Sequence, residues 1–154
     1  MIPLQHIHPI LVHFPIVFML TLAVFDVVAI ARGASVTQRT AAGNVSTGLA
    51  VLAALFAVVT FVFGGMALDI AESGGFRSNV AEIHEGLGTF TAVAFGAWGA
   101  LRAFVWWRNM SIGGAFRALV PVAEVVGAVL VTATAFYGGQ LVYDLGVNVA
   151  QAAM

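Results

Sequence analysis

The sequence predicts an all-α integral membrane protein, an up-down bundle of four transmembrane helices. Of its 154 residues, 61% are hydrophobic and 8% are charged, and the mean hydropathy is +1.02. A soluble domain carries about 25% charged residues, so an ordinary water-soluble fold is excluded. The apolar residues also form four long runs, and a membrane-spanning helix needs about 20 such residues.

The four runs define the expected elements in order. They cover residues 9–31, about 40–68, about 82–107 and about 119–142. Because the links are short, consecutive helices should be antiparallel neighbours in one transmembrane domain over residues 1–154. The start of the chain lacks the basic region of a signal peptide, so we expect the first run to be retained.

The first run opens with two histidines between prolines, His8-Pro9 and His13-Phe-Pro15. Proline suits the first position of a helix, which places His8 at the cap. Pro15 lacks an amide donor and clashes with the preceding turn, so the helix should loosen near His13. The local helix phase is therefore uncertain, and the sequence leaves open which of the two histidines faces the bundle.

Small residues line one face of the second run at steps of four and three, which favours close helix packing. They are Ser46, Ala50, Ala53, Ala57, Thr60, Gly64 and Ala67. Phe63-Gly64-Gly65 in this run resembles Tyr137-Gly138-Gly139 in the fourth, and an aspartate follows each. The spacing is not constant, so a duplicated helical hairpin remains an alternative to four unrelated helices.

The third run begins near His84, and at 100° per residue Gly88, Thr91 and Arg102 share its face. A guanidinium facing lipid is costly, so Arg102 should point into the bundle. Its expected partners are Asp26 and Glu124, near the same end of neighbouring runs. We interpret this group as an ion pair that fixes helix register, with a proton relay as the alternative.

Arginine placement predicts the orientation. Five of the six basic residues lie in or beside the first and third links, namely Arg32, Arg39, Arg102, Arg108 and Arg117. The positive-inside rule then places both termini and all four histidines on the periplasmic side of a bacterial inner membrane. The net charge of −1 and the absence of lysine argue against a nucleic-acid partner.

Histidines from two helices, with glycines on the intervening ones, are typical of a bundle that holds haem b. We predict His13 and His84 as axial ligands, with His8 as a substitute or a hydrogen-bonding neighbour. Gly64, Gly88, Thr91 and Gly138 would line the site. Because the chain has no cysteine, disulfides, iron–sulfur ligation and covalent haem attachment are excluded.

Two other functions remain open from the residues alone. His8, His13 and His84 would suit zinc or copper, with Glu82 or Glu85 assisting. The third alternative is a structural or assembly subunit of a membrane redox complex that holds no cofactor. An electron-transfer protein is favoured over a stand-alone enzyme, and association of several copies of the chain is left open.

The opening run His8-Pro9-Ile-Leu-Val-His13-Phe-Pro15-Ile, with Phe25-Asp26 further on, resembles a bacterial family catalogued as domain of unknown function 2231. Family members are small four-span membrane proteins, some fused or encoded with Rieske or c-type cytochrome modules. The resemblance implies electron transfer between a donor such as quinol and a periplasmic Rieske-type or cytochrome partner. By position, it makes His8, His13 and His84 the candidate functional residues and Asp26 a candidate inner polar residue.

Overall fold

The computed structural model describes residues 3–149, and within them all regular structure is helical. A short 3-10 turn, Leu4–His6, leads into α1 (Ile7–Leu11) and α2 (His13–Ala31), which together form the first span. The other spans are α3 (Ala41–Ser73), α4 (Asn79–Trp107) and α5 (Leu119–Tyr143), the last preceded by a 3-10 turn at Gly114–Ala118. All four are long and apolar enough to cross a membrane, which confirms the predicted fold class.

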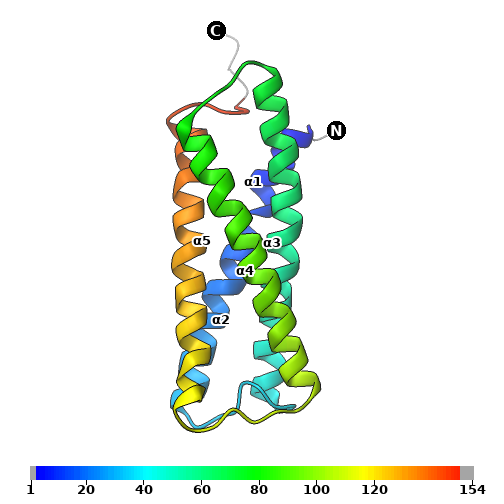
Figure 1. Ribbon diagram of the computed structural model, residues 1–154, viewed down its shortest axis with the longest axis vertical. Coiled ribbons are helices and arrows are strands. Elements are labelled where there is room, and N and C mark those ends of the chain that lie inside the picture. The colour runs from blue at the N-terminus through cyan, green and yellow to red at the C-terminus, as the bar shows by residue number, and fades with distance from the viewer. Residues whose placement is uncertain (1–2, 150–154) are drawn as a thin grey trace.

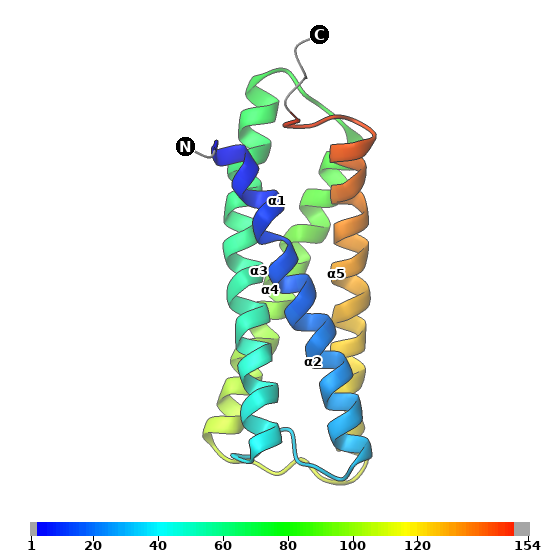
Figure 2. The same ribbon diagram turned by 180° about the vertical axis from the view of Figure 1, so that it is seen from behind.

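The helices run up and down as a four-helix bundle, with both termini and the α3–α4 link at one end (Figures 1 and 2). α3 packs against α2 and α4, and α5 packs against the same two helices. α2 and α4 therefore lie diagonally across the bundle axis, as do α3 and α5. We call the end with the termini the terminal end, and the opposite end, with the first and third links, the link end.

The first span is interrupted between α1 and α2, at Val12. Pro15, four residues after Leu11, has no N–H to donate to the carbonyl of Leu11, so the hydrogen-bond ladder lacks a rung there. The interruption lies where the prolines predicted it. It separates the helix that carries His8 from the longer helix that begins with His13.

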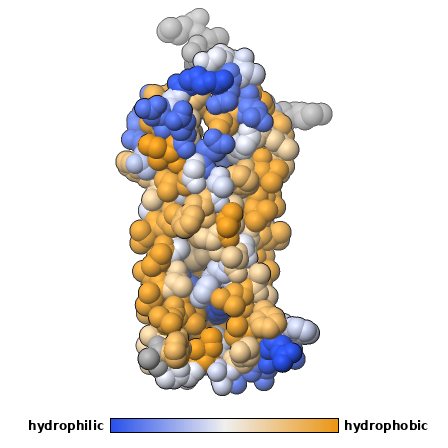
Figure 3. Space-filling model, in the orientation of Figure 1, coloured by the Kyte–Doolittle hydropathy of each residue, from blue (hydrophilic) through white to orange (hydrophobic). Residues whose placement is uncertain are grey.

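Small side chains bring the helices close together in the middle of the bundle. Ala50, Ala53 and Ala57 of α3 are buried against Met19, Leu22, Phe95 and Val131 of the other helices. The outward faces instead expose valine, leucine and phenylalanine, and a hydrophobic surface covers the middle of the molecule between polar ends (Figure 3). This is the arrangement of a bundle whose outer surface contacts lipid.

Candidate functional site

His8 belongs to α1, at the terminal end, and its side chain packs against α3. Its Nδ1 is 3.0 Å from the backbone carbonyl oxygen of Thr60. The ring lies directly on the backbone of Gly64, where a Cβ atom would be 2.9 Å from the imidazole Cε1. Glycine at this position is therefore what allows the ring to approach α3. α3 therefore holds the half-buried imidazole both by the hydrogen bond at Thr60 and by the close contact at Gly64.

His84 of α4 repeats this arrangement with α5. Its Nδ1 is 3.0 Å from the carbonyl oxygen of Thr134. A Cβ atom at Gly138 would be 2.9 Å from its Cε1. In both cases the histidine contacts the next span along the chain, and the carbonyl lies one helical turn before the glycine. The two halves of the protein thus build the same local structure.

The spacing of these residues supports a duplicated hairpin. The step of 76 residues that separates Asp26 from Arg102 also separates His8 from His84. A step two residues shorter relates Thr60 to Thr134, and the glycines that follow them one turn later have the same shorter step. The separation between the histidine and the threonine is 52 residues in the first half and 50 in the second, so the spacing along the whole sequence is not constant.

The two imidazoles meet across the bundle axis in a T-shaped arrangement. Their ring centroids are 6.1 Å apart, and the ring planes are inclined at 74°. A metal ion bound to two imidazoles at about 2.0–2.1 Å per bond holds the ring centroids roughly 6 Å apart when all three are collinear. The separation of His8 and His84 therefore suits two ligands of one central atom.

Hydrogen bonding fixes the tautomer of both rings. A carbonyl oxygen is only an acceptor, so Nδ1 of His8 and of His84 must carry the proton and donate it. Nε2 is then the nitrogen with a free lone pair, the form in which imidazole binds a metal. Within residues 3–149, neither Nε2 accepts a hydrogen bond from another protein group.

The histidine pair lies between two hollows. One, of about 900 Å³ including its open mouth, extends toward the terminal end past Gln5, Phe76 and Asn148. The other, of about 480 Å³, extends toward the middle of the bundle past Ala57 and Val131. His8, Phe61, His84 and Gly88 line both. Mostly apolar walls with a few convergent polar groups are typical of a cofactor site.

The other predicted lining residues lie in the same region. Gly64 and Gly138 border the outer hollow, and Thr91 borders the inner one. The Thr91 hydroxyl is hydrogen-bonded to the Thr134 hydroxyl at 2.9 Å. Glu85 borders the outer hollow with an exposed side chain, whereas Glu82 lines neither hollow.

The structure does not bring His13 to this site. Its side chain is exposed, and its Nδ1 lies 3.3 Å from the carbonyl oxygen of Ile10 in the preceding turn. His6 is also turned elsewhere, with Nε2 3.1 Å from the carbonyl oxygen of Asn148. Across residues 3–149, no three histidine or acidic side chains are grouped so that they could hold a metal ion. The pair that meets is His8 and His84.

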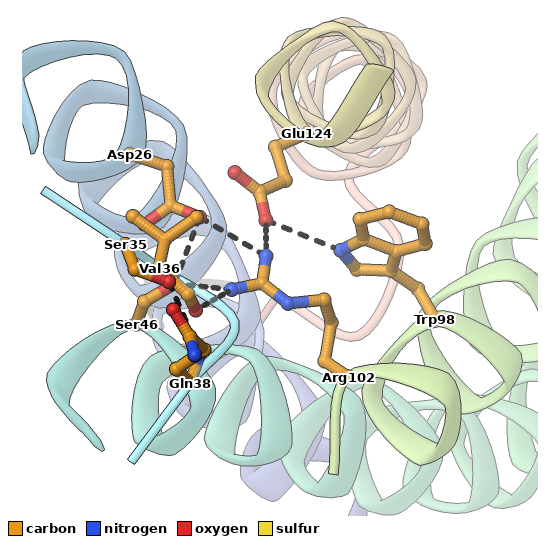
Figure 4. A network of polar contacts seen from close by, with 8 residues as sticks. All are labelled: Asp26, Ser35, Val36, Gln38, Ser46, Trp98, Arg102 and Glu124. Carbon is orange, nitrogen blue, oxygen red and sulfur yellow. Dashed lines mark hydrogen bonds and ion pairs between the residues drawn. The ribbon is translucent and has the colours of Figure 1, made fainter. Parts of the chain in front are cut away.

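A second polar group lies near the link end. Arg102 of α4 extends between Asp26 of α2 and Glu124 of α5, the partners expected from the sequence (Figure 4). Its Nη1 is 3.0 Å from Asp26 Oδ2 and also contacts Glu124 Oε1. Ser46 of α3 donates to Asp26 Oδ2 at 2.8 Å, so all four spans contribute to this cluster.

The bundle and its central polar groups define the class of protein as a four-span α-helical membrane protein. The chain belongs to the family described as predicted membrane protein DUF2231, whose model matches residues 4–151. No curated protein and no solved structure matches it.

Proposed function

We propose that this protein is a membrane-anchored b-type cytochrome in which His8 and His84 are the axial ligands of one haem. The observation that carries the proposal is the close imidazole pair, with ring centroids 6.1 Å apart and the free lone pair of each ring on Nε2. Bound haem b would supply reversible one-electron transfer at the iron. The ligand pair differs from the sequence prediction, because His13 lies outside the cavity.

The protein's own groups prepare both ligands. A donated Nδ1–H orients the imidazole and makes Nε2 a stronger electron donor to a metal. The carbonyl oxygens of Thr60 and Thr134 accept hydrogen bonds from these two N–H groups on opposite sides of the axis. A planar group standing between the rings would extend into both hollows, whose walls would exclude water from its faces.

The side of the membrane on which the histidine pair lies determines which redox partners it could reach. Arg32, Arg39, Arg108 and Arg117 lie at the link end, and Arg77 lies at the other. By the positive-inside rule, we propose a bacterial inner-membrane location with the termini and the histidine pair toward the periplasm. Electrons would then pass between quinol or another membrane donor and a periplasmic redox partner.

The test is a visible spectrum of the protein purified in mild detergent, both oxidised and reduced with dithionite. We expect a Soret band and sharp bands on reduction, and we expect His8→Ala and His84→Ala each to lose the six-coordinate signature. His13→Ala is the matched control and should keep the spectrum. Haem bands that survive both substitutions, or that depend on His13, would contradict the ligand assignment.

A colourless preparation would overturn the cytochrome proposal. Elemental analysis would then separate the alternatives, because stoichiometric zinc or copper lost in His84→Ala would indicate a metal site at the same pair. A metal-free, colourless protein would favour a structural or assembly role.

A further inference from the structure

The cluster near the link end carries a charge imbalance. Asp26 and Glu124 are 0% exposed and Arg102 is 2% exposed, so three ionisable groups lie in the interior. With every group ionised, two negative charges would face one positive charge. Burying an uncompensated charge costs several kcal/mol, and a membrane interior offers no solvent to offset it.

The two carboxylates are close enough to repel each other strongly. Asp26 Oδ2 and Glu124 Oε1 both bond to Nη1 of Arg102, so these two oxygens are within about 6 Å of each other. Two acids that share a buried site do not both ionise readily, and one normally keeps its proton. The guanidinium neutralises only one of them.

No second cation on the packed elements balances the cluster. α3 contributes the Ser46 hydroxyl, the first link contributes the Val36 carbonyl, and α4 adds the indole of Trp98. Two other guanidiniums of this end donate to backbone carbonyls instead: Arg117 Nη2 to those of Ile30 and Ala34, and Arg39 to those of Trp106 and Trp107. The described residues therefore leave one negative charge without a partner.

Two oxygen atoms in the cluster have no hydrogen bond among the described residues. They are Asp26 Oδ1 and Glu124 Oε2, both fully buried. A buried carboxylate normally accepts hydrogen bonds at both oxygens, so each of these atoms lacks a hydrogen. One added proton would cancel the excess charge and turn one of these oxygens into a hydrogen-bond donor.

We infer that this cluster is a proton-binding site, in which Glu124 holds one exchangeable proton at neutral pH. The donors decide between the two acids. Asp26 Oδ2 accepts from Arg102 at 3.0 Å and from the Ser46 hydroxyl at 2.8 Å, which favours the ionised form. Apart from Arg102, the one donor to Glu124 among the described residues is Trp98, whose Nε1 lies 3.4 Å from Oε1.

A hollow between the first and third links gives this proton a route to water. Its volume is about 640 Å³, and it is lined by Val36, Thr37 and Gln38 on one side and by Ser111 to Gly114 and the charged Arg117 on the other. The carbonyl of Val36 accepts from Arg102 Nη2 at 2.8 Å. One residue thus separates the hollow from the cluster, and Figure 4 shows Val36 beside the guanidinium.

The test is infrared spectroscopy of the whole protein in detergent or lipid, with and without D2O exchange. We expect a protonated-carboxyl C=O band at neutral pH that shifts to lower frequency in D2O. Protein grown with ¹³C-carboxyl glutamate should show the band shifted, whereas ¹³C-aspartate should leave it in place. Glu124→Gln should abolish the band, and Glu82→Gln, a substitution at an exposed site on α4, should retain it.

The labelled wild-type protein keeps the test decisive even if Glu124→Gln does not fold. Absence of the band would overturn the proposal, as would a band that moves only with labelled aspartate. A band that survives Glu124→Gln in folded protein would assign the proton elsewhere. Absence of the band together with stabilisation by NaCl over choline chloride would show that a cation, not a proton, neutralises the site. A band insensitive to prolonged D2O exchange would refute the proposed route.

Discussion

Alanine at Gly64, compared with alanine at the adjacent Gly65, tests the packing of His8 directly. In a helix interior, glycine to alanine by itself stabilises by about 0.5–1 kcal/mol. At Gly65 the new methyl group would meet nothing within 4 Å, so this gain should be realised. At Gly64 it would lie 2.9 Å from Cε1 and 3.0 Å from Nδ1 of the imidazole, closer than Cβ contacts occur.

The imidazole cannot move aside freely, because Nδ1 is bonded to the carbonyl of Thr60. Overpacking of a fixed group costs about 1–3 kcal/mol. Breaking the hydrogen bond instead costs about 0.5–1.5 kcal/mol. Since the helix-propensity gain is common to both variants and the cheaper of the two responses prevails, Gly64→Ala should be less stable than Gly65→Ala by about 0.5–1.5 kcal/mol.

The assay is equilibrium unfolding in mixed detergent, followed by circular dichroism, with both variants measured side by side. The equivalent comparison in the second half is Gly138→Ala with Gly139→Ala, where the nearest atom to the Gly139 methyl group is 4.0 Å away. Equal stability within either pair would refute the packing argument. If haem binds as proposed, Gly64→Ala and Gly138→Ala should also lower its occupancy.

Three further substitutions test other contacts of the bundle, each by the same unfolding measurement. Gly99→Ala would place a methyl group 2.5 Å from an alanine Cβ of α3 and should destabilise the protein by about 1–3 kcal/mol. Gly96→Ala is the control, because the nearest atom to its methyl group would be 3.9 Å away. Similar stabilities of the two variants would contradict the close helix contact. Arg102→Ala leaves two buried acids without their cation and should destabilise the protein by about 3–5 kcal/mol. Arg108 is exposed, so Arg108→Ala should have little effect on stability. A loss below about 1 kcal/mol for Arg102→Ala would show that the cluster is not buried as described. Thr91→Val removes one hydroxyl hydrogen bond and should cost about 0.6 kcal/mol, and a loss of several kcal/mol would indicate a larger role for this contact.

Hydropathy and helix periodicity were sufficient to predict the four spans and much of the packing between them. The predicted end of the third helix, residue 107, agrees with α4, and the fourth span ends one residue later than expected. α3 is the exception, because it continues to Ser73 beyond Asp69. A charged residue ends the apolar run, but it does not end a helix, since α3 is long enough to project from the hydrocarbon region.

The candidate site was harder to predict because of two prolines. Helical phase can be extrapolated along α4, so Gly88, Thr91 and Arg102 could be placed on the face of His84. Because the helix is interrupted at Val12, the helical phase of α2 cannot be extrapolated from that of α1. Periodicity therefore could not show whether His8 or His13 faces the bundle interior. The backbone carbonyls that hold the imidazoles carry no side-chain signature. The signal that could have found the pair was the 76-residue step, which links His8 and not His13 to His84.

The two polar sites, each formed by residues at corresponding positions of the two hairpins, have contrasting requirements. Equivalent positions of the two halves meet across the axis at both ends, as His8 with His84 and as Asp26 with Arg102. Unlike charges at equivalent positions satisfy each other, and only the extra acid, Glu124, requires a further ligand. Identical imidazoles do not, because each ring donates its Nδ1 proton to a backbone carbonyl and its Nε2 has no proton to give the other ring. In the cytochrome that we propose, iron bound by both Nε2 atoms would be the shared electron-pair acceptor, and its planar macrocycle would extend into the hollows on either side.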